Sequence, residues 1–284
     1  MLVYFNNFWN GFLEKTDPVN VAFFIKLLST IYNTEITISN NMNNSDILVE
    51  SIFGNNSYIT YKKWKYSFLF TGESYYSEMS KQYIDNYTCV LGFQSTHNNF
   101  VECPLFIPYM ICNSCDFTPI QHIPLNAASV VISNSSGQER NLFLDKLEKQ
   151  ISLLYGGSYK NNIGGSINGT YHSDNLINFY KKTRFTVTME NSREDYYITE
   201  KIINGFRAGN IPIYWGSPYI TKYFNPKRFL LLENTSENTI TQLIEKIITI
   251  TDNEYISIIN EPILNISIDE LFNKMVESIK VLLA

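Results

Sequence analysis

The sequence predicts an α/β protein of two domains, each built on a parallel sheet. Short apolar, β-branched stretches alternate with amphipathic stretches of helical spacing along most of the chain. Strands that alternate with helices indicate a parallel sheet covered on both faces. The length of 284 residues exceeds what one hydrophobic core usually serves, so two domains are favoured over one large domain.

The first part of the chain shows this alternation clearly. Strands are expected at 2–5, 35–38, 47–53, 66–70 and 89–93, with an amphipathic helix at 19–32 and an asparagine-rich surface loop at 40–45. Prolines give 103–109 and 116–127 an extended character, which places the connection between domains there. We therefore predict an N-terminal domain of residues 1–122 and a C-terminal domain of residues 123–284.

The second domain begins with a strand at 130–133 and a helix that follows Gly137. Further strands are expected at 185–189, 211–215 and 229–232, and further helices at 173–182, 198–209, 236–250, 254–259 and 267–283. Gly209 lies where the helix at 198–209 should end, and Pro212 prevents that helix from continuing. The strand, helix and strand from 185 to 215 therefore predict a right-handed crossover between parallel strands.

Polar residues gather where the strand at 185–189 ends and the next helix begins. Lys201 is the informative one, because a lysine in the first turn opposes the positive end of the helix dipole. A broken local rule of this kind indicates a functional site. Free backbone N–H groups, the dipole and an ammonium group together suit a phosphate or diphosphate. The alternative is a solvent-facing Lys201 paired with Glu194 or Asp195.

Charge and hydropathy exclude several classes of partner. The net charge is −5, the pI is about 5.3 and no basic run stands out, so nucleic acid is an unexpected partner. No apolar run reaches membrane-spanning length, and Asn6, Asn7 and Asn10 interrupt the segment where a signal peptide would need an apolar centre. We expect a soluble, cytoplasmic protein, and the Asn, Ile, Lys and Tyr bias suggests a bacterial or viral source.

Four cysteines raise the question of a metal or redox site. Cys112 and Cys115 form a C-x-x-C pair, but His122 is the only nearby imidazole and no second pair follows at zinc-site spacing. Free thiols in a reducing compartment are the favoured interpretation.

Several motifs, in order, resemble the donor-binding signature of the α-1,3/1,4-fucosyltransferase family, particularly its soluble bacterial members. They are Glu190-Asn191-Ser192, Tyr197-Ile198-Thr199-Glu200-Lys201, residues 209–216 and Phe224-Asn225-Pro226. The resemblance implies a GT-B architecture, in which two Rossmann-like domains have parallel sheets facing across an interdomain cleft. It also implies inverting transfer of L-fucose from GDP-β-L-fucose to a glycan hydroxyl, with the acceptor on the N-terminal domain and GDP-fucose on the C-terminal domain.

The resemblance assigns roles to individual residues. Asn191, Tyr197 and Glu200 would contact the nucleotide sugar, and Lys201 would bind its diphosphate. Arg140, near the start of the helix after Gly137, matches the family's diphosphate-binding arginine; the alternative is an ordinary helix arginine paired with an acidic neighbour.

Catalytic roles follow from the same resemblance. Glu73, which follows Gly72 after the strand at 66–70, matches the acid favoured as general base; the alternative is an N-cap or solvated carboxylate. Glu190 would either stabilise positive charge on the sugar ring or only order the Asn191 loop. Trp9 would line the acceptor cleft or serve as a core aromatic.

The expected partners are GDP-fucose and an N-acetyllactosamine-like acceptor glycan with a GlcNAc or Glc residue, joined through an α-1,3 or α-1,4 linkage. No Asp-x-Asp motif occurs, so we expect no required metal or other cofactor, although the sequence leaves metal stimulation open. A transferase of another nucleotide sugar and a non-catalytic binder on the same fold are the alternatives.

Overall fold

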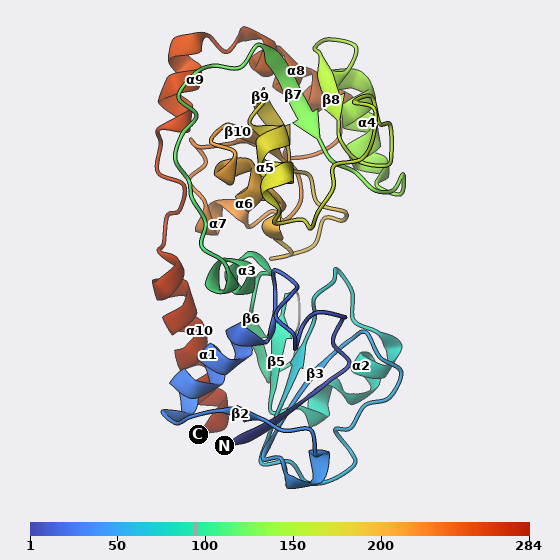
Figure 1. The fold of residues 1–284 in the computed structure, drawn as a ribbon, viewed down its shortest axis with the longest axis vertical. Coiled ribbons are helices and arrows are strands. Elements are labelled where there is room, and N and C mark those ends of the chain that lie inside the picture. The colour runs from blue at the N-terminus through green and yellow to red at the C-terminus, as the bar shows by residue number, and fades with distance from the viewer. Residues whose placement is uncertain (94–95) are drawn as a thin grey trace. The chain divides into compact units, whose positions relative to one another are not determined.

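The computed structural model describes residues 1–93 and 96–284, which form two compact units. The first contains Met1–Ser114 and Ser267–Ala284, and the second contains Cys115–Ile266 (Figure 1). The predicted division after residue 122 differs from this one in two ways. The boundary falls at residue 114, and the terminal helix belongs to the first unit.

The first unit is built on a six-stranded, entirely parallel sheet of order β2-β1-β3-β4-β5-β6. Its strands are β1 (Leu2–Asn6), β2 (Thr37–Ile38), β3 (Ile47–Ser51), β4 (Tyr66–Phe70), β5 (Cys89–Gly92) and β6 (Phe100–Glu102). The five predicted strands are confirmed, some with shorter bounds. β6 is an addition, because three residues are too few for a clear alternating pattern.

The helices of this unit are α1 (Val21–Tyr32), α2 (Glu78–Tyr83), α3 (Phe106–Cys112) and α10 (Ile268–Leu283), with 3₁₀ turns η1 (Met42–Asn44) and η2 (Ile84–Asn86). The segment 103–109 was expected to be extended but contains the start of α3. Pro108 is the third residue of that helix, where its missing N–H group is not needed.

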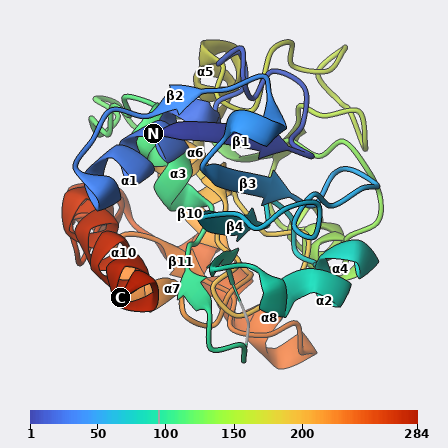
Figure 2. The ribbon, with the colours of Figure 1, turned by 90° about the horizontal axis from the view of Figure 1, so that it is seen from below.

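The terminal helix α10 explains why the first unit takes residues from both ends of the chain. It packs on α1, α3 and β6, and both ribbon views show it beside α1 (Figures 1 and 2). Leu271 and Phe272 are buried by this packing, and the Lys26 ammonium lies 4.8 Å from the Phe272 ring centroid. The apolar stripe of α10 therefore completes the core of the first unit.

The second unit has a five-stranded parallel sheet of order β11-β10-β9-β7-β8. Its strands are β7 (Asn126–Val130), β8 (Leu153–Tyr155), β9 (Thr183–Val187), β10 (Ile211–Tyr214) and β11 (Leu230–Leu231), and its helices are α4 (Gln138–Leu147), α5 (Asp174–Tyr180), α6 (Glu200–Arg207), α7 (Ile220–Tyr223), α8 (Glu237–Thr249) and α9 (Asp252–Ile259). The β9-α6-β10 crossover with parallel strands is confirmed. The strand order reverses between β7 and β9, because β8 lies on one side of β7 and all later strands lie on the other.

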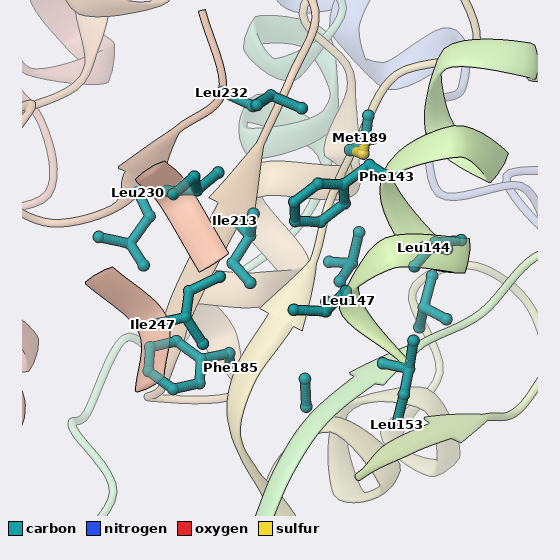
Figure 3. Close-up of a cluster of buried hydrophobic side chains, with 14 of the residues drawn as sticks. Phe143, Leu144, Leu147, Leu153, Phe185, Met189, Ile213, Leu230, Leu232 and Ile247 are labelled. Carbon is teal, nitrogen blue, oxygen red and sulfur yellow. The ribbon is translucent and has the colours of Figure 1, made fainter. Parts of the chain in front are cut away.

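One large apolar cluster fixes the second unit (Figure 3). Side chains of α4, including Phe143 and Leu147, meet Phe185 and Ile213 of the sheet and Ile247 of α8. Alternate residues from Phe185 to Met189 enter this cluster, as the two-residue period of a strand requires. The rigid cluster holds the carboxyl ends of β7 and β9 in place.

Within residues 1–93 and 96–284, no helix is both long and apolar enough to cross a membrane.

Candidate active site

A pocket of about 370 Å³ opens in the second unit at the carboxyl ends of β7 and β9. It lies where the strand order reverses, the position at which parallel α/β sheets bind ligands. Arg140, Asn191, Glu200 and Lys201 line it. The structure therefore brings together four of the five residues that the resemblance assigned to the nucleotide sugar, from three separate segments of the chain.

Glu190 anchors this site from beneath. Its carboxylate is fully buried and accepts hydrogen bonds from the Thr199 backbone N–H at 2.8 Å and from the Thr199 hydroxyl at 2.9 Å. It also accepts one from the Lys201 ammonium at 3.1 Å. Thr199 is the N-cap of α6, and its hydroxyl accepts a hydrogen bond from the Lys201 N–H. Glu190 thus compensates the lysine that breaks the dipole rule in the first turn.

The charge of Lys201 is stable in this setting. Burial disfavours its ammonium form, but the carboxylates of Glu190 and Glu200 outweigh burial, so the pKa of Lys201 is raised. Its side chain is 28% exposed and lines the pocket. Burial raises the pKa of Glu200, with Lys201 opposing the shift and Glu190 adding to it. The pocket therefore presents a permanent cation beside a carboxyl group that holds its proton more tightly than usual.

Arg140 supplies a second cation to the pocket. It is only 5% exposed; its guanidinium donates to the Asn191 side-chain oxygen at 3.3 Å and to the Asn134 carbonyl at 3.1 Å. Its Nε is buried and has no hydrogen-bond partner among the described residues. Burial lowers the pKa of Arg140, yet arginine stays charged at neutral pH. No carboxylate among the described residues bonds to this buried guanidinium, which therefore suits an anionic ligand.

Glu190 and Tyr197 are placed differently from the other predicted residues. Neither belongs to the pocket lining that the described residues form. Tyr197 is 3% exposed, and its backbone N–H donates to the Glu194 carbonyl. The Glu190 side chain holds Thr199 and Lys201 from inside the protein, and the Tyr197 side chain is buried.

A loop that the sequence did not single out forms another wall of the pocket. Gly169, Thr170 and Tyr171 line it, together with Asn204 of α6, whose side-chain amide donates to the Tyr171 carbonyl at 2.7 Å. The spacing of Asn204 from Glu200 could have predicted that Asn204 lines the pocket, since residues four apart share a helix face. The loop itself is irregular and carries no pattern.

The glycine pair Gly164–Gly165 lies outside this pocket. Gly164 and Gly165 are absent from the described pocket lining, and an added Cβ at either would meet no atom within 4 Å. Their φ angles of +85° and +156° show that they serve a turn.

Glu73 lies in the first unit, after β4, and is partly buried. The Thr71 hydroxyl donates to the Glu73 and Tyr75 carbonyls, both at 3.0 Å, which orders this turn. A Cβ at Gly72 would lie 3.2 Å from the Trp9 ring. Gly72, which precedes Glu73, thus lies beside an aromatic cluster that includes Trp9 and Phe53, whose ring centroids lie 5.4 Å apart.

Metal-ligating residues do not cluster in the part of the chain that the structure describes: no three His, Cys, Asp or Glu side chains gather there in a metal-binding arrangement. All four cysteines are free thiols, and burial raises the pKa of each. Metal independence stays a prediction.

The two parallel α/β units have the fold of GT-B glycosyltransferases. A solved α1,3-fucosyltransferase in complex with GDP-fucose superposes with a TM-score of 0.72 at 23% identity, covering 99% of this chain and 90% of that one. An α-glucosyltransferase solved with UDP and a DNA 13-mer gives 0.57 at 11% identity, over 99% and 93% of the two chains. At these identities the superpositions define the fold alone.

Sequence comparisons relate part of the second unit to a known family. Residues 125–257 match the model of glycosyltransferase family 10 (fucosyltransferase), C-terminal domain. The α-(1,3)-fucosyltransferase FucT of Helicobacter pylori is 40% identical over 103 residues, 36% of this chain and 20% of that protein. The matched segment is a fifth of the length of that relative. Residues 125–257 are therefore similar to family 10, and the predicted resemblance is confirmed.

Proposed function

We propose that the protein is an inverting α-1,3-fucosyltransferase that moves L-fucose from GDP-β-L-fucose to a hydroxyl group of a GlcNAc- or Glc-containing glycan. The observation that carries the proposal is the pocket at the strand reversal, where Arg140 and Lys201 converge from two segments of a family 10 domain. The H. pylori relative is named for α-(1,3)-fucosyl transfer, and the structural neighbour was solved with GDP-fucose.

The cations account for departure of the leaving group. As the bond between the anomeric carbon and the β-phosphate oxygen breaks, negative charge grows on the diphosphate. Arg140 offers a planar set of N–H donors and Lys201 a point charge, and both are held before the donor binds. Asn191 and Glu200 orient the ribose or fucose hydroxyls, and no step requires a metal.

Glu73 is the proposed general base. The acceptor hydroxyl attacks the anomeric carbon from the face opposite GDP and loses its proton to this carboxylate, which inverts the β-linked donor to an α-fucoside. Glu190 is proposed as a positioning residue, because its carboxylate is bonded to Thr199 and Lys201 beneath the pocket. It fixes the ammonium that the diphosphate meets.

The test is GDP release from GDP-fucose, with and without N-acetyllactosamine. We expect acceptor-dependent release in the wild type and a loss of about 10²–10⁴-fold in Glu73→Gln. Glu78→Gln is the control, because Glu78 lies five residues after Glu73, is exposed and pairs with Lys81; this variant should retain full activity. GDP-mannose serves as the competing donor. Faster turnover of GDP-mannose would contradict the donor assignment, and GDP binding without turnover of any glycan tried would contradict transferase activity.

A further inference from the structure

Tyr196 and Tyr219 form a ring stack in the second unit that the proposed reaction does not use. Their centroids lie 4.3 Å apart, with 19° between the ring planes. Tyr196 belongs to the loop between β9 and α6, and Tyr219 to the loop between β10 and α7. Both loops leave the carboxyl ends of neighbouring parallel strands. The stack therefore lies at the same edge of the sheet as the donor pocket.

One buried hydroxyl fixes the backbone of both tyrosines. The Ser217 Oγ accepts hydrogen bonds from the Tyr196 N–H at 2.8 Å and from the Tyr219 N–H at 3.2 Å, and Ser217 is 1% exposed. Neither ring takes part in these bonds. The two rings are therefore presented from a pre-formed support.

The backbone of Tyr196 indicates that its side chain has a use. Its φ is +62°, in the left-handed region, where a non-glycine residue is strained. Glycine would make the same turn without this strain. Strain of this kind is typical of functional sites, where the surrounding structure compensates it.

The stack has one ring available for a ligand. The Lys222 ammonium lies 4.7 Å from the Tyr196 ring centroid, so that ring contacts a cation as well as Tyr219. Tyr219 is 40% exposed. Tyr196 is also five residues from both Asn191 and Lys201 of the pocket lining, so it lies within about 18 Å of each along the chain.

We propose that the Tyr196–Tyr219 stack is a second sugar subsite, on which one pyranose ring of the acceptor glycan packs while another ring receives fucose. A pyranose has an apolar C–H face and a polar rim, which match the face and hydroxyl of a tyrosine. A rigid stacked pair binds such a ring at little cost in conformational entropy. The inference rests on the proposed function, because the acceptor is the reactant that the donor pocket leaves unbound.

The test compares Tyr219→Ala with the wild type on a long and a short acceptor, an oligosaccharide and monomeric GlcNAc. We expect KM for the oligosaccharide to rise about tenfold, because the variant loses the aromatic face on which the sugar ring packs. KM for GlcNAc, KM for GDP-fucose and the acceptor-independent hydrolysis of GDP-fucose should stay unchanged. Tyr219→Trp should retain oligosaccharide binding. Tyr61→Ala, which removes a 62% exposed tyrosine from the first unit, is the matched control.

An equal rise in the KM of Tyr219→Ala for GDP-fucose would contradict the subsite, because it would show that the stack only holds the loop between β9 and α6 in place for donor binding. Equal effects on both acceptors, or no effect, would also overturn it. If the wild type does not turn over GDP-fucose, the proposed transferase activity is contradicted, but the sugar subsite is not yet tested. Binding of the protein to immobilised oligosaccharides then tests the subsite. Binding that Tyr219→Ala loses and Tyr61→Ala keeps would still support it, whereas no binding by the wild type would contradict it.

Discussion

Each unit buries a glutamate near the carboxyl end of a central strand, but the two carboxylates have different partners. Glu50 of β3 is fully buried and accepts hydrogen bonds from the Asn6 amide at 2.6 Å and the Tyr87 hydroxyl at 2.6 Å. Ser57 and the Tyr58 backbone N–H donate to it as well, both at 2.8 Å. All four donors are neutral. Glu50 therefore holds the loop after β3 against the sheet, and it does so through these uncharged donors.

Glu190 is equally buried, but one of its donors is the ammonium group of Lys201, which reaches the pocket. The buried charge thus has a partner that a ligand can contact. Burial of a carboxylate therefore does not by itself mark a functional site. What distinguishes Glu190 is a cation that it holds at a surface where an anion can bind.

The largest effect should come from removing that cation. We expect Lys201→Met to lower kcat/KM for GDP-fucose about 10²–10³-fold, because a charged donor to the leaving group is lost. Lys160→Met is the control: Lys160 is 27% exposed in the same unit and pairs with Asp145 and Glu148, but it is not part of the described pocket lining. Steady-state kinetics of both variants measure the difference. Equal losses would show that general electrostatics, and no specific contact, controls the rate.

Neutralising the two buried glutamates compares the units directly. Glu190→Gln and Glu50→Gln should each lower the free energy of unfolding by about 1.5–3 kcal/mol, because each loses charge-assisted hydrogen bonds. Only Glu190→Gln should also raise KM for GDP-fucose. Urea unfolding and donor titration of both variants provide the measurement. A rise in donor KM in Glu50→Gln would end the distinction between the two sites.

A methyl group beside Glu190 gives a subtler perturbation. A Cβ at Gly216 would lie 2.6 Å from the Glu190 Cγ and 2.6 Å from the Tyr214 hydroxyl, whereas a Cβ at Gly165 would meet nothing within 4 Å. Their φ angles of +159° and +156° give both substitutions similar backbone strain. Gly216→Ala should therefore cost about 1–3 kcal/mol more than Gly165→Ala, from overpacking, and should weaken GDP binding. Similar Tm and affinity in the two variants would show that Glu190 and Tyr214 can move without consequence.

The smallest effect concerns pH. The folded pKa of Glu200 is raised, so the folded state binds its proton more tightly than the unfolded chain. The stability due to this proton is present below the unfolded pKa of about 4.3 and is lost as pH rises through the folded pKa. Glu200→Gln removes this dependence. Its Tm relative to wild type should therefore increase as pH rises from about 4.3, and a pH-independent difference in Tm would contradict the raised pKa.

The elements that position the site could be predicted from sequence because local rules govern them. The helical spacing after Ile198 and the stop at Gly209 gave α6, and the broken dipole rule at Lys201 pointed to the pocket. Local rules did not predict the ion-pair partner of Lys201. Glu190 lies eleven residues earlier and reaches Lys201 only through the fold, whereas Glu194 and Asp195 are closer in sequence.

Other features depend on contacts between distant segments. The placement of α10 in the first unit follows from its packing on α1, and no signal in residues 267–283 specifies that partner. The pocket wall formed by residues 169–171 depends on the Asn204 side chain of α6, which donates a hydrogen bond to this irregular loop. Tyr197 matched the family motif, but a motif does not say whether a side chain faces the ligand or supports the loop behind it.

The most direct test of the account is calorimetric titration of GDP into the wild type, Lys201→Met and Lys160→Met. We predict binding to the wild type and to Lys160→Met with equal affinity, and at least about tenfold weaker binding to Lys201→Met, since a charged hydrogen bond contributes about 1.5–3 kcal/mol. Absence of GDP binding to the wild type, or equal affinity in Lys201→Met, would contradict the assignment of this pocket to the diphosphate.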